Sequence, residues 1–276
     1  MNALKETKKK HLLAILKYLY LHNSSTMNEL VENLQLSQPS IRNMVRTLQE
    51  KQLIQEVGND LSSGGRCPTR FALNEKNYLI LCLYVQVDKV IYQLRNFNEI
   101  KKEGILFYQS EDELKKTIKD LIDQEKIHCC QIAVEGIVYE DVYVTDHHNV
   151  LEKHQWLKDI KKEINIPLQL QNDVKMIHQE CYFTYQQDST YYLYINEVGI
   201  GSSYFYKDEP LYGRSGIMGE IGLISLKGKT INQQIRECQN QEEFNEILSL
   251  LLSIVFTMID PKRLELSLDL KWRYEK

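Results

Sequence analysis

The sequence predicts an α/β protein in two parts: a winged helix-turn-helix domain over residues 1–74 and a two-lobed α/β domain over residues 75–276. Apolar residues at helical spacing dominate the first part, whereas strand-like runs alternate with helical ones from residue 78 onward. A chain of 276 residues, 43% of them hydrophobic, is long enough for two domains and a sizeable core.

The first domain is expected to begin with a helix over residues 6–22 and to continue with two short helices joined by a tight turn. Thr26 is a suitable N-cap with Glu29 three residues later, the spacing of a capping box. Ser37 can cap the following helix, where Pro39 in the first turn loses no hydrogen bond. The apolar stripe of that helix is then Ile41, Met44, Val45 and Leu48.

The outward face of this helix is polar. None of the positions that we assign to DNA binding is an acid. Such side chains donate to or accept from base edges and phosphates in the major groove. A short helical hairpin with a solvated polar face remains the alternative. The predicted DNA-binding positions on the helix are Gln38, Ser40, Arg42, Asn43 and Arg46.

A β-wing is predicted to follow, as strand, turn and strand over residues 55–74. Gly64 and Gly65 permit backbone angles that other residues resist, and Arg66 follows them directly. An arginine on a small extended tip fits a narrow, electronegative minor groove, so Arg66 is the sixth predicted DNA-binding residue. A flexible interdomain linker that contains an arginine is the alternative.

The charge is distributed unevenly along the chain. Residues 1–74 contain ten Lys and Arg against six Asp and Glu, while the remaining residues contain 24 against 32. A basic first domain on an acidic body fits binding of double-stranded DNA by the first part only.

The other composition signals indicate a cytoplasmic protein. No run of eighteen apolar residues could span a membrane, and the basic start lacks a signal-peptide cleavage site. The six cysteines are scattered, with no Cys-x-x-Cys pair and no zinc-like spacing. Scattered cysteines fit a reducing compartment.

In the second part, helices are expected over residues 111–125, 156–164, 175–185 and 241–259. Strands are expected over 78–87, 90–97, 99–109, 128–139 and 166–174, followed by a hairpin within 190–212. The run 128–139 is almost continuously apolar, which is typical of a strand buried on both faces. Strands feeding helices, with hairpins at the start of each half, predict the two-lobed α/β domain.

Several motifs occur in the order found in one family. They are SSGGRCPTRFALN, IAVEGIV, LQLQNDVKMIHQE, YLYINEVGIGSSYFYKDEPLYGRSGIMGEIGLI and FTMIDPKRLELS. This set resembles the ROK-type transcriptional regulators. The resemblance implies a winged helix-turn-helix joined to an actin-like sugar-kinase fold, in a repressor of carbohydrate-related genes that responds to a sugar or sugar phosphate. It leads us to expect a homodimer on DNA.

The resemblance also indicates where kinase activity would reside. Family kinases hold the ATP phosphates with a glycine-rich turn between the first two strands, but here residues 85–89 read Val-Gln-Val-Asp-Lys. A backbone cradle for phosphate needs close approach, which these residues oppose. The second glycine loop, Gly199-Ile200-Gly201, is retained, although a simple hairpin turn explains it equally well. We therefore expect no enzyme activity and no catalytic residues, with a sugar kinase as the alternative.

Three positions match sugar-contacting residues of the family. Asp173 corresponds to the aspartate that activates the sugar hydroxyl in family kinases, and Asn172 and Glu220 correspond to residues that hydrogen-bond sugar hydroxyls. An amide and carboxylates converging on a cleft suit a polyol. The alternative for Asn172 and Asp173 is that they only cap the helix starting near Lys175.

The family's zinc site is not expected here. Leu223 stands where the family has a histidine, and the segment that follows contains one cysteine, Cys238, which cannot build a four-ligand site. We expect neither a metal nor another cofactor. The C-terminal half is expected to be abbreviated relative to the family, so a regulator that has lost small-molecule sensing and responds to a protein partner is a further alternative.

Overall fold

The computed structural model describes residues 2–60, 67–75, 78–147, 150–185, 188–207 and 209–270. The chain divides into two compact units, which are described separately. One consists of Met1–Leu81, Gln93–Glu103 and Lys126–His128, and the other of Cys82–Tyr92, Gly104–Glu125 and Cys129–Lys276. Within the described residues, no helix combines the length and apolar character needed to cross a bilayer.

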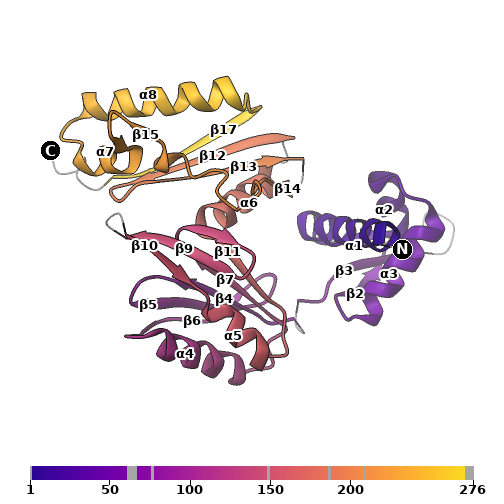
Figure 1. Cartoon of the computed structure of the whole chain (residues 1–276). Helices are drawn as coiled ribbons and strands as arrows, with labels where there is room; N and C mark the ends of the chain where they lie inside the picture. The colour runs from indigo at the N-terminus through magenta and orange to yellow at the C-terminus, as the bar shows by residue number, and fades with distance from the viewer. Residues whose placement is uncertain are drawn as a thin grey trace. The chain divides into compact units, whose positions relative to one another are not determined.

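The N-terminal region consists of three helices and a small antiparallel sheet (Figure 1). The helices are α1 (Asn2–His22), α2 (Met27–Leu34) and α3 (Gln38–Glu50), and the sheet has the strand order β1-β3-β2. Its strands are β1 (Ser25–Thr26), β2 (Ile54–Asn59) and β3 (Thr69–Leu73). One apolar cluster joins helices and sheet, and its fully buried members are Ile15, Leu19, Leu30, Ile41 and Val45.

The caps of α2 and α3 are those predicted from the sequence. Thr26 Oγ1 accepts from the Glu29 amide at 3.3 Å, and Glu29 Oε2 accepts from the Thr26 amide at 2.8 Å, which completes the capping box. A left-handed Gln35, with φ of 53°, ends α2, and Ser37 two residues later is the N-cap of α3. The predicted stripe of α3 is buried at Ile41, Met44, Val45 and Leu48.

Strands β2 and β3 pair antiparallel from Ile54↔Leu73 onward, with a register shift between Glu56 and Gly58. The connection at residues 61–66, including the predicted DNA-binding Arg66, lies outside the described residues. Arg70 fixes the end of this ladder next to the connection, because its Nη1 lies 2.8 Å from Asp60 Oδ1 and its Nη2 lies 3.3 Å from Glu29 Oε2. Arg70 therefore joins β3 to the first turn of α2.

A five-stranded sheet in the α/β part has the order β11-β7-β4-β5-β6. Its strands are β4 (Ile80–Val85), β5 (Lys89–Arg95), β6 (Ile100–Phe107), β7 (Cys129–Val134) and β11 (Leu168–Asn172). The helices predicted between these strands are present as α4 (Glu111–Asp123) and α5 (Trp156–Glu163). Strands β7 and β11 are parallel, so their carboxyl ends, at Val134 and Asn172, lie side by side.

The apolar run over residues 128–139 is not the single strand that we predicted. It divides after Val134 into β7 and the short β8 (Ile137–Tyr139), which belongs to a separate antiparallel sheet, β10-β9-β8. Gly136 makes the break, because its φ is +102° and a Cβ there would lie 2.2 Å from the Val144 carbonyl oxygen. The remaining strands are β9 (Val142–His147) and β10 (Val150–His154).

The second large sheet has the order β14-β13-β12-β17. Its strands are β12 (Ser189–Asn196), β13 (Ile200–Tyr206), β14 (Glu209–Pro210) and β17 (Arg263–Asp269), and β12 runs parallel to β17. Helices α7 (Ile231–Glu237) and α8 (Gln241–Met258) cover one side, and α6 (Asp173–Tyr185) lies on the other (Figure 1). Buried residues at the centre of the α7–α8 side include Leu193, Ile195, Ile231, Phe244 and Leu251.

Candidate functional site

The exposed face of α3 is the first candidate site. The Gln38, Arg42 and Asn43 side chains are exposed on the side opposite the buried stripe. Ser40 is half-buried, and its hydroxyl lies 2.8 Å from the Ser37 hydroxyl, so it takes part in the N-cap. The five predicted positions other than Arg66 therefore share one helix, but Ser40 is less accessible than its neighbours.

Arg46 is also exposed, with 79% of its side chain accessible. Its Nε donates to Glu50 Oε1 at 2.9 Å, one helical turn further on. Glu50 is an acid on the exposed side of α3, beside the predicted DNA-binding positions. Glu50 lowers the positive charge that Arg46 contributes to the face, and so it weakens the attraction of α3 for phosphate.

The second candidate site surrounds Asp173, at the start of α6. Asp173 Oδ1 accepts from the Val174 amide at 2.8 Å. The Tyr84 hydroxyl lies 3.2 Å from Asp173 Oδ2 and 2.8 Å from Glu135 Oε1, and so it bridges two carboxyl groups. Burial raises the pKa of Asp173 to about 6, and the negative charge of Glu135 adds to the shift.

Glu220 and Lys175 complete this group, which we call the carboxylate cluster: Tyr84, Glu135, Asp173, Lys175 and Glu220. Burial raises the pKa of Glu220 to about 7, Asp173 raises it further, and the Lys175 ammonium opposes the rise. Lys175 is 1% exposed, and burial lowers its pKa while Glu220 counteracts that change. Its Nζ donates to the Gly216 carbonyl at 3.3 Å and lies 5.3 Å from the centre of the Tyr212 ring.

Asn172 contributes to the backbone around the carboxylate cluster. Its Oδ1 accepts from the Lys175 amide at 3.0 Å, and its Nδ2 donates to the Gly136 carbonyl at 2.9 Å. The first bond is the capping role that the sequence left open, and the second fixes the bend between β7 and β8. Both polar atoms of the Asn172 amide thus have partners within the protein. A sugar hydroxyl could bond only to the second lone pair of Oδ1 or to the second N–H of Nδ2.

Tyr84, Glu135 and Lys175 were not among the site residues predicted from the sequence. Glu135 and Asp173 each directly follow a strand, β7 and β11, and those strands are parallel neighbours. Polar residues just beyond adjacent parallel strands were therefore an available signal. Lys175 offered no such signal, because a lysine in the first turn of a helix is normally solvated.

The two loops related to phosphate binding have ordinary structural explanations. Between β4 and β5 the Gln86 amide donates to the Lys89 carbonyl at 2.9 Å, which closes a tight turn without glycine. In the glycine loop, Asn232 Oδ1 accepts from the Ile200 amide at 2.9 Å. A Cβ on Gly199 would lie 2.6 Å from that same oxygen, so the loop's glycine accommodates the Asn232 side chain.

The residues after the Gly-Glu-Ile-Gly motif do not fit the zinc site that the family resemblance implies. Leu223, in a short 3-10 turn over Ile221–Leu223, has no donor atom in its side chain. The Cys238 thiol donates to the Asn240 carbonyl oxygen at 3.3 Å. Zinc prefers thiolate and imidazole ligands in a tetrahedral set, which this segment does not supply.

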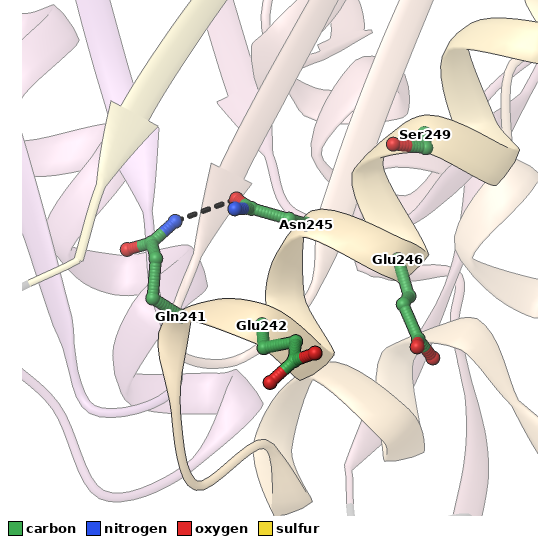
Figure 2. Close-up of a pocket in the computed structure, with 5 residues that line it drawn as sticks. All are labelled: Gln241, Glu242, Asn245, Glu246 and Ser249. Carbon is green, nitrogen blue, oxygen red and sulfur yellow. Dashed lines mark hydrogen bonds between the residues drawn. The ribbon is translucent and has the colours of Figure 1, made fainter.

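Helix α8 has an open hollow along its polar side (Figure 2). Gln241 Nε2 donates to Asn245 Oδ1 at 2.6 Å, and Figure 2 shows these two side chains facing each other one turn apart. All five lining residues belong to this one helix, so no second element encloses a ligand there. The lining residues are Gln241, Glu242, Asn245, Glu246 and Ser249.

Comparison with known proteins identifies the family. A model of the ROK family matches residues 104–249, more than half of the chain. The chain belongs to the ROK family. Its mixed α/β fold of the ROK sugar-kinase type confirms the fold predicted for the second part of the sequence.

The ROK relatives include regulators. The xylose repressor of Staphylococcus xylosus is 24% identical over 229 residues, which cover 75% of this chain and 58% of the repressor. This chain therefore matches less than two thirds of that protein's length. Among solved structures, a ROK family transcriptional regulator, homologous to the E. coli MLC protein, is similar with a TM-score of 0.70 and 15% identity, over 88% of this chain and 78% of that one.

A second solved structure, a ROK family protein from Streptococcus pneumoniae in complex with sucrose, is similar with a TM-score of 0.56 and 13% identity. The match covers 69% of this chain and 80% of that one. At 15% and 13% identity, the similarity to the ROK regulator and to the sucrose complex shows that this chain shares their fold.

Proposed function

We propose that this ROK protein is a DNA-binding transcriptional regulator, a repressor of carbohydrate-related genes, that reads DNA through a winged helix-turn-helix within residues 1–74. In this proposal α2 and α3 form the helix-turn-helix, β2 and β3 form the wing, and residues 75–276 form the effector and dimerisation domain. Helix α3 is the recognition helix, and Arg66 lies at the tip of the wing.

The exposed polar face of α3 is the observation that carries this proposal. One side of the helix is buried at Ile41, Val45 and Leu48, which orients Arg42 and Asn43 toward solvent. Arginine and asparagine are the side chains suited to guanine and adenine edges. The fold likeness to the ROK regulator supports the proposal further, because it covers 88% of the chain and so extends beyond residues 104–249.

Binding of the purified chain to the DNA upstream of its own gene tests this function. We expect a saturable gel shift that Arg42→Ala weakens about fivefold or more, since one good base or phosphate contact contributes about 1–3 kcal/mol. Lys158→Ala, at an exposed position of α5, is the matched control and should bind like the wild type. An Arg42→Ala protein that remains folded and binds with unchanged affinity would exclude α3 as the reading element.

We propose in addition that the carboxylate cluster, with Asn172, is the place where a sugar effector binds. Asp173 and Glu220 can each accept more than one hydrogen bond, which suits a polyol. Three carboxyl groups against one ammonium repel a phosphate, so an uncharged sugar or an amino sugar is favoured over a sugar phosphate.

A thermal-shift series with hexoses, pentoses, amino sugars and their phosphates tests the effector. The expected result is a concentration-dependent rise in Tm with a sugar that Glu220→Gln abolishes. Failure of every sugar would instead favour the regulator that responds to a protein partner, and it would leave the DNA-binding proposal intact.

A sugar kinase is the second candidate, because a carboxyl with a pKa of about 6 suits a general base. The tight turn of residues 86–89 and the Asn232 side chain beside Gly199 argue against ATP binding. Sugar-dependent ATP hydrolysis that disappears in Asp173→Asn would establish the kinase.

A further inference from the structure

The three strands of the N-terminal sheet meet at Arg70, in the central strand β3. The Arg70 backbone lies opposite Thr26 of β1 on one side and opposite Gly58 of β2 on the other. Strand β1 ends at Thr26, so the next residue pair outward, Asn59↔Thr69, joins β2 and β3 alone. Among the described residues, no third strand supports the hairpin beyond this point.

We call this outer part the hairpin stem, residues 58–60 on one side and residues 68–70 on the other. Its last described backbone bond runs from the Asp60 amide to the Pro68 carbonyl oxygen, at 3.0 Å. The stem follows a register shift and begins at Gly58, whose φ is +139°. A bulge bends a strand, and a two-stranded ribbon twists more freely than a wider sheet. The backbone alone therefore leaves the direction of the stem weakly fixed.

The Arg70 guanidinium provides the missing restraint. Its Nη1 donates to both oxygens of Asp60, at 2.8 and 2.9 Å. Its Nη2 donates to Glu29 Oε2 and to the Ser24 carbonyl oxygen, each at 3.3 Å. Its Nε donates to the Ser24 hydroxyl at 3.1 Å. All three nitrogens of the side chain are thus used.

The acceptors belong to three different parts of the N-terminal region. Asp60 directly follows β2, Glu29 lies in the first turn of α2, and Ser24 joins α1 to β1. Glu29 is itself held, because its Oε2 accepts from the Thr26 amide in the capping box. The guanidinium therefore connects the stem to a carboxylate whose position on α2 is already fixed.

This network has more effect on direction than on stability. The side chains of Arg70, Glu29 and Asp60 are 29%, 42% and 38% exposed, and ion pairs this accessible to water contribute little to the free energy of unfolding. The planar guanidinium nevertheless bonds in fixed directions, above all in its two bonds to Asp60. Its main consequence is the orientation of the stem relative to α2 and α3.

We propose that Arg70 is a positioning residue for DNA recognition, which holds the hairpin stem against α2 so that the stem and α3 reach the duplex together. This inference rests on the proposed function. A hairpin already held in its bound orientation loses less conformational freedom on binding, so the affinity for DNA is higher.

Hydrogen exchange of the full chain tests the restraint without DNA. Arg70→Lys keeps the positive charge but loses the planar fork. Peptides that contain the stem, and the Asp60 amide in particular, should lose protection in this variant, while peptides from α3 should not change. Arg236→Lys, the same substitution at a half-buried position of α7, is the matched control and should leave the stem unaffected.

Fluorescence anisotropy with the DNA upstream of the chain's own gene tests the consequence for binding. Asp60→Asn removes a negative charge, which by electrostatics alone would strengthen binding to phosphate. Positioning predicts the opposite, a loss of about threefold to tenfold, because the stem must be ordered when DNA binds. Arg70→Lys should lose a similar factor although its charge is unchanged. Glu32→Gln, which removes an exposed acid of α2 outside the network, should not weaken binding.

The double variant Arg70→Lys/Asp60→Asn distinguishes one restraint from two separate effects. Because both substitutions break the same connection, the double variant should bind DNA about as well as the weaker single variant. Urea unfolding of the same proteins should give midpoints close to that of the wild type, as expected of an exposed network.

Stem peptides that exchange equally in the wild type and in Arg70→Lys would overturn the proposal. So would an Asp60→Asn protein that binds DNA as tightly as the wild type or more tightly, or losses that add in the double variant. A wild type that binds no duplex would remove both the proposed function and the DNA part of this inference. Hydrogen exchange would still decide whether Arg70 holds the stem.

Discussion

Arg46 Nε donates a 2.9 Å hydrogen bond to Glu50 Oε1 on the exposed side of α3. If this face lies against DNA, Glu50 both repels phosphate and holds Arg46 in an intrahelical pair. Both effects are small in water but increase beside a polyanion.

Glu50→Gln should therefore strengthen DNA binding. We expect a gain of about threefold to tenfold on a nonspecific duplex at low salt, measured by fluorescence anisotropy, because one repulsive charge is removed and Arg46 is released. Arg46→Ala should weaken binding on the same duplex. If Glu50→Gln and Arg46→Ala change the affinity in the same direction, Arg46 does not face the phosphates.

The capping box at Thr26 should contribute measurably to the stability of the N-terminal unit. Thr26→Ala leaves the Glu29 amide without its acceptor, at a cost of about 1 kcal/mol in the free energy of unfolding. Thr26→Ser keeps the acceptor and should remain close to the wild type. Urea unfolding of the three proteins checks this, and equal midpoints for Ala and Ser would contradict the cap's role.

The contributions of Lys175 and Glu220 to the free energy of unfolding should depend on each other. Lys175→Met removes the positive charge that opposes the raised pKa of Glu220, so that pKa should rise further above 7. A carboxyl whose folded pKa exceeds its unfolded value is favourable at low pH and loses that contribution as pH rises through the folded pKa. The decrease in the free energy of unfolding caused by Lys175→Met should thus be larger at pH 8, roughly 3 kcal/mol, than at pH 5.

The double variant Lys175→Met/Glu220→Gln completes this test. It removes the uncompensated carboxylate, so most of the stability lost at pH 8 should return, and the difference between pH 8 and pH 5 should shrink. Unfolding curves at the two pH values give the coupling free energy. A double variant as unstable at pH 8 as Lys175→Met alone would show that the charge pair is not the cause.

His178 should make the fold sensitive to acid. It is fully buried in α6, with Nε2 2.9 Å from Thr190 Oγ1 and its ring against Phe205, and burial lowers its pKa to about 4. The unfolded chain then binds the proton more strongly, so stability is complete above the unfolded pKa of 6.5 and falls as pH drops toward 4.

The expected contribution of His178 is roughly 3 kcal/mol across that range. His178→Gln should remove this part of the pH dependence, whereas His22→Gln, at an exposed position of α1, should not. Thermal unfolding at pH 7 and pH 4.5 makes the comparison. Equal pH dependence in the wild type and His178→Gln would exclude His178 as the cause.

The sequence predicted those elements whose signals are local. Thr26 with Glu29, and the spacing from Ile41 to Leu48, depend on residues within two turns of one another, and the structure has both. The run 128–139 was predicted wrongly as one strand, because the break at Gly136 depends on the close approach of Val144 from a strand later in the chain.

The candidate effector site shows the same division. Asp173 and Glu220 were found through motifs, but Tyr84 and Glu135 reach Asp173 only through the order of strands in the sheet. The buried position of Lys175 depends on Gly216, 41 residues later. Such contacts join segments that are distant in the sequence, so they cannot be predicted from the local pattern of residues.

The salt dependence of DNA binding tests the central claim most directly. If α3 places Arg42 on a phosphate or base, the slope of log K against log salt should be shallower by about 0.9 per lost phosphate contact in Arg42→Ala, and the slope for Lys158→Ala should equal that of the wild type. A wild-type chain that binds DNA with the same affinity and slope as Arg42→Ala and Arg46→Ala would contradict the assignment of α3 as the DNA-reading helix.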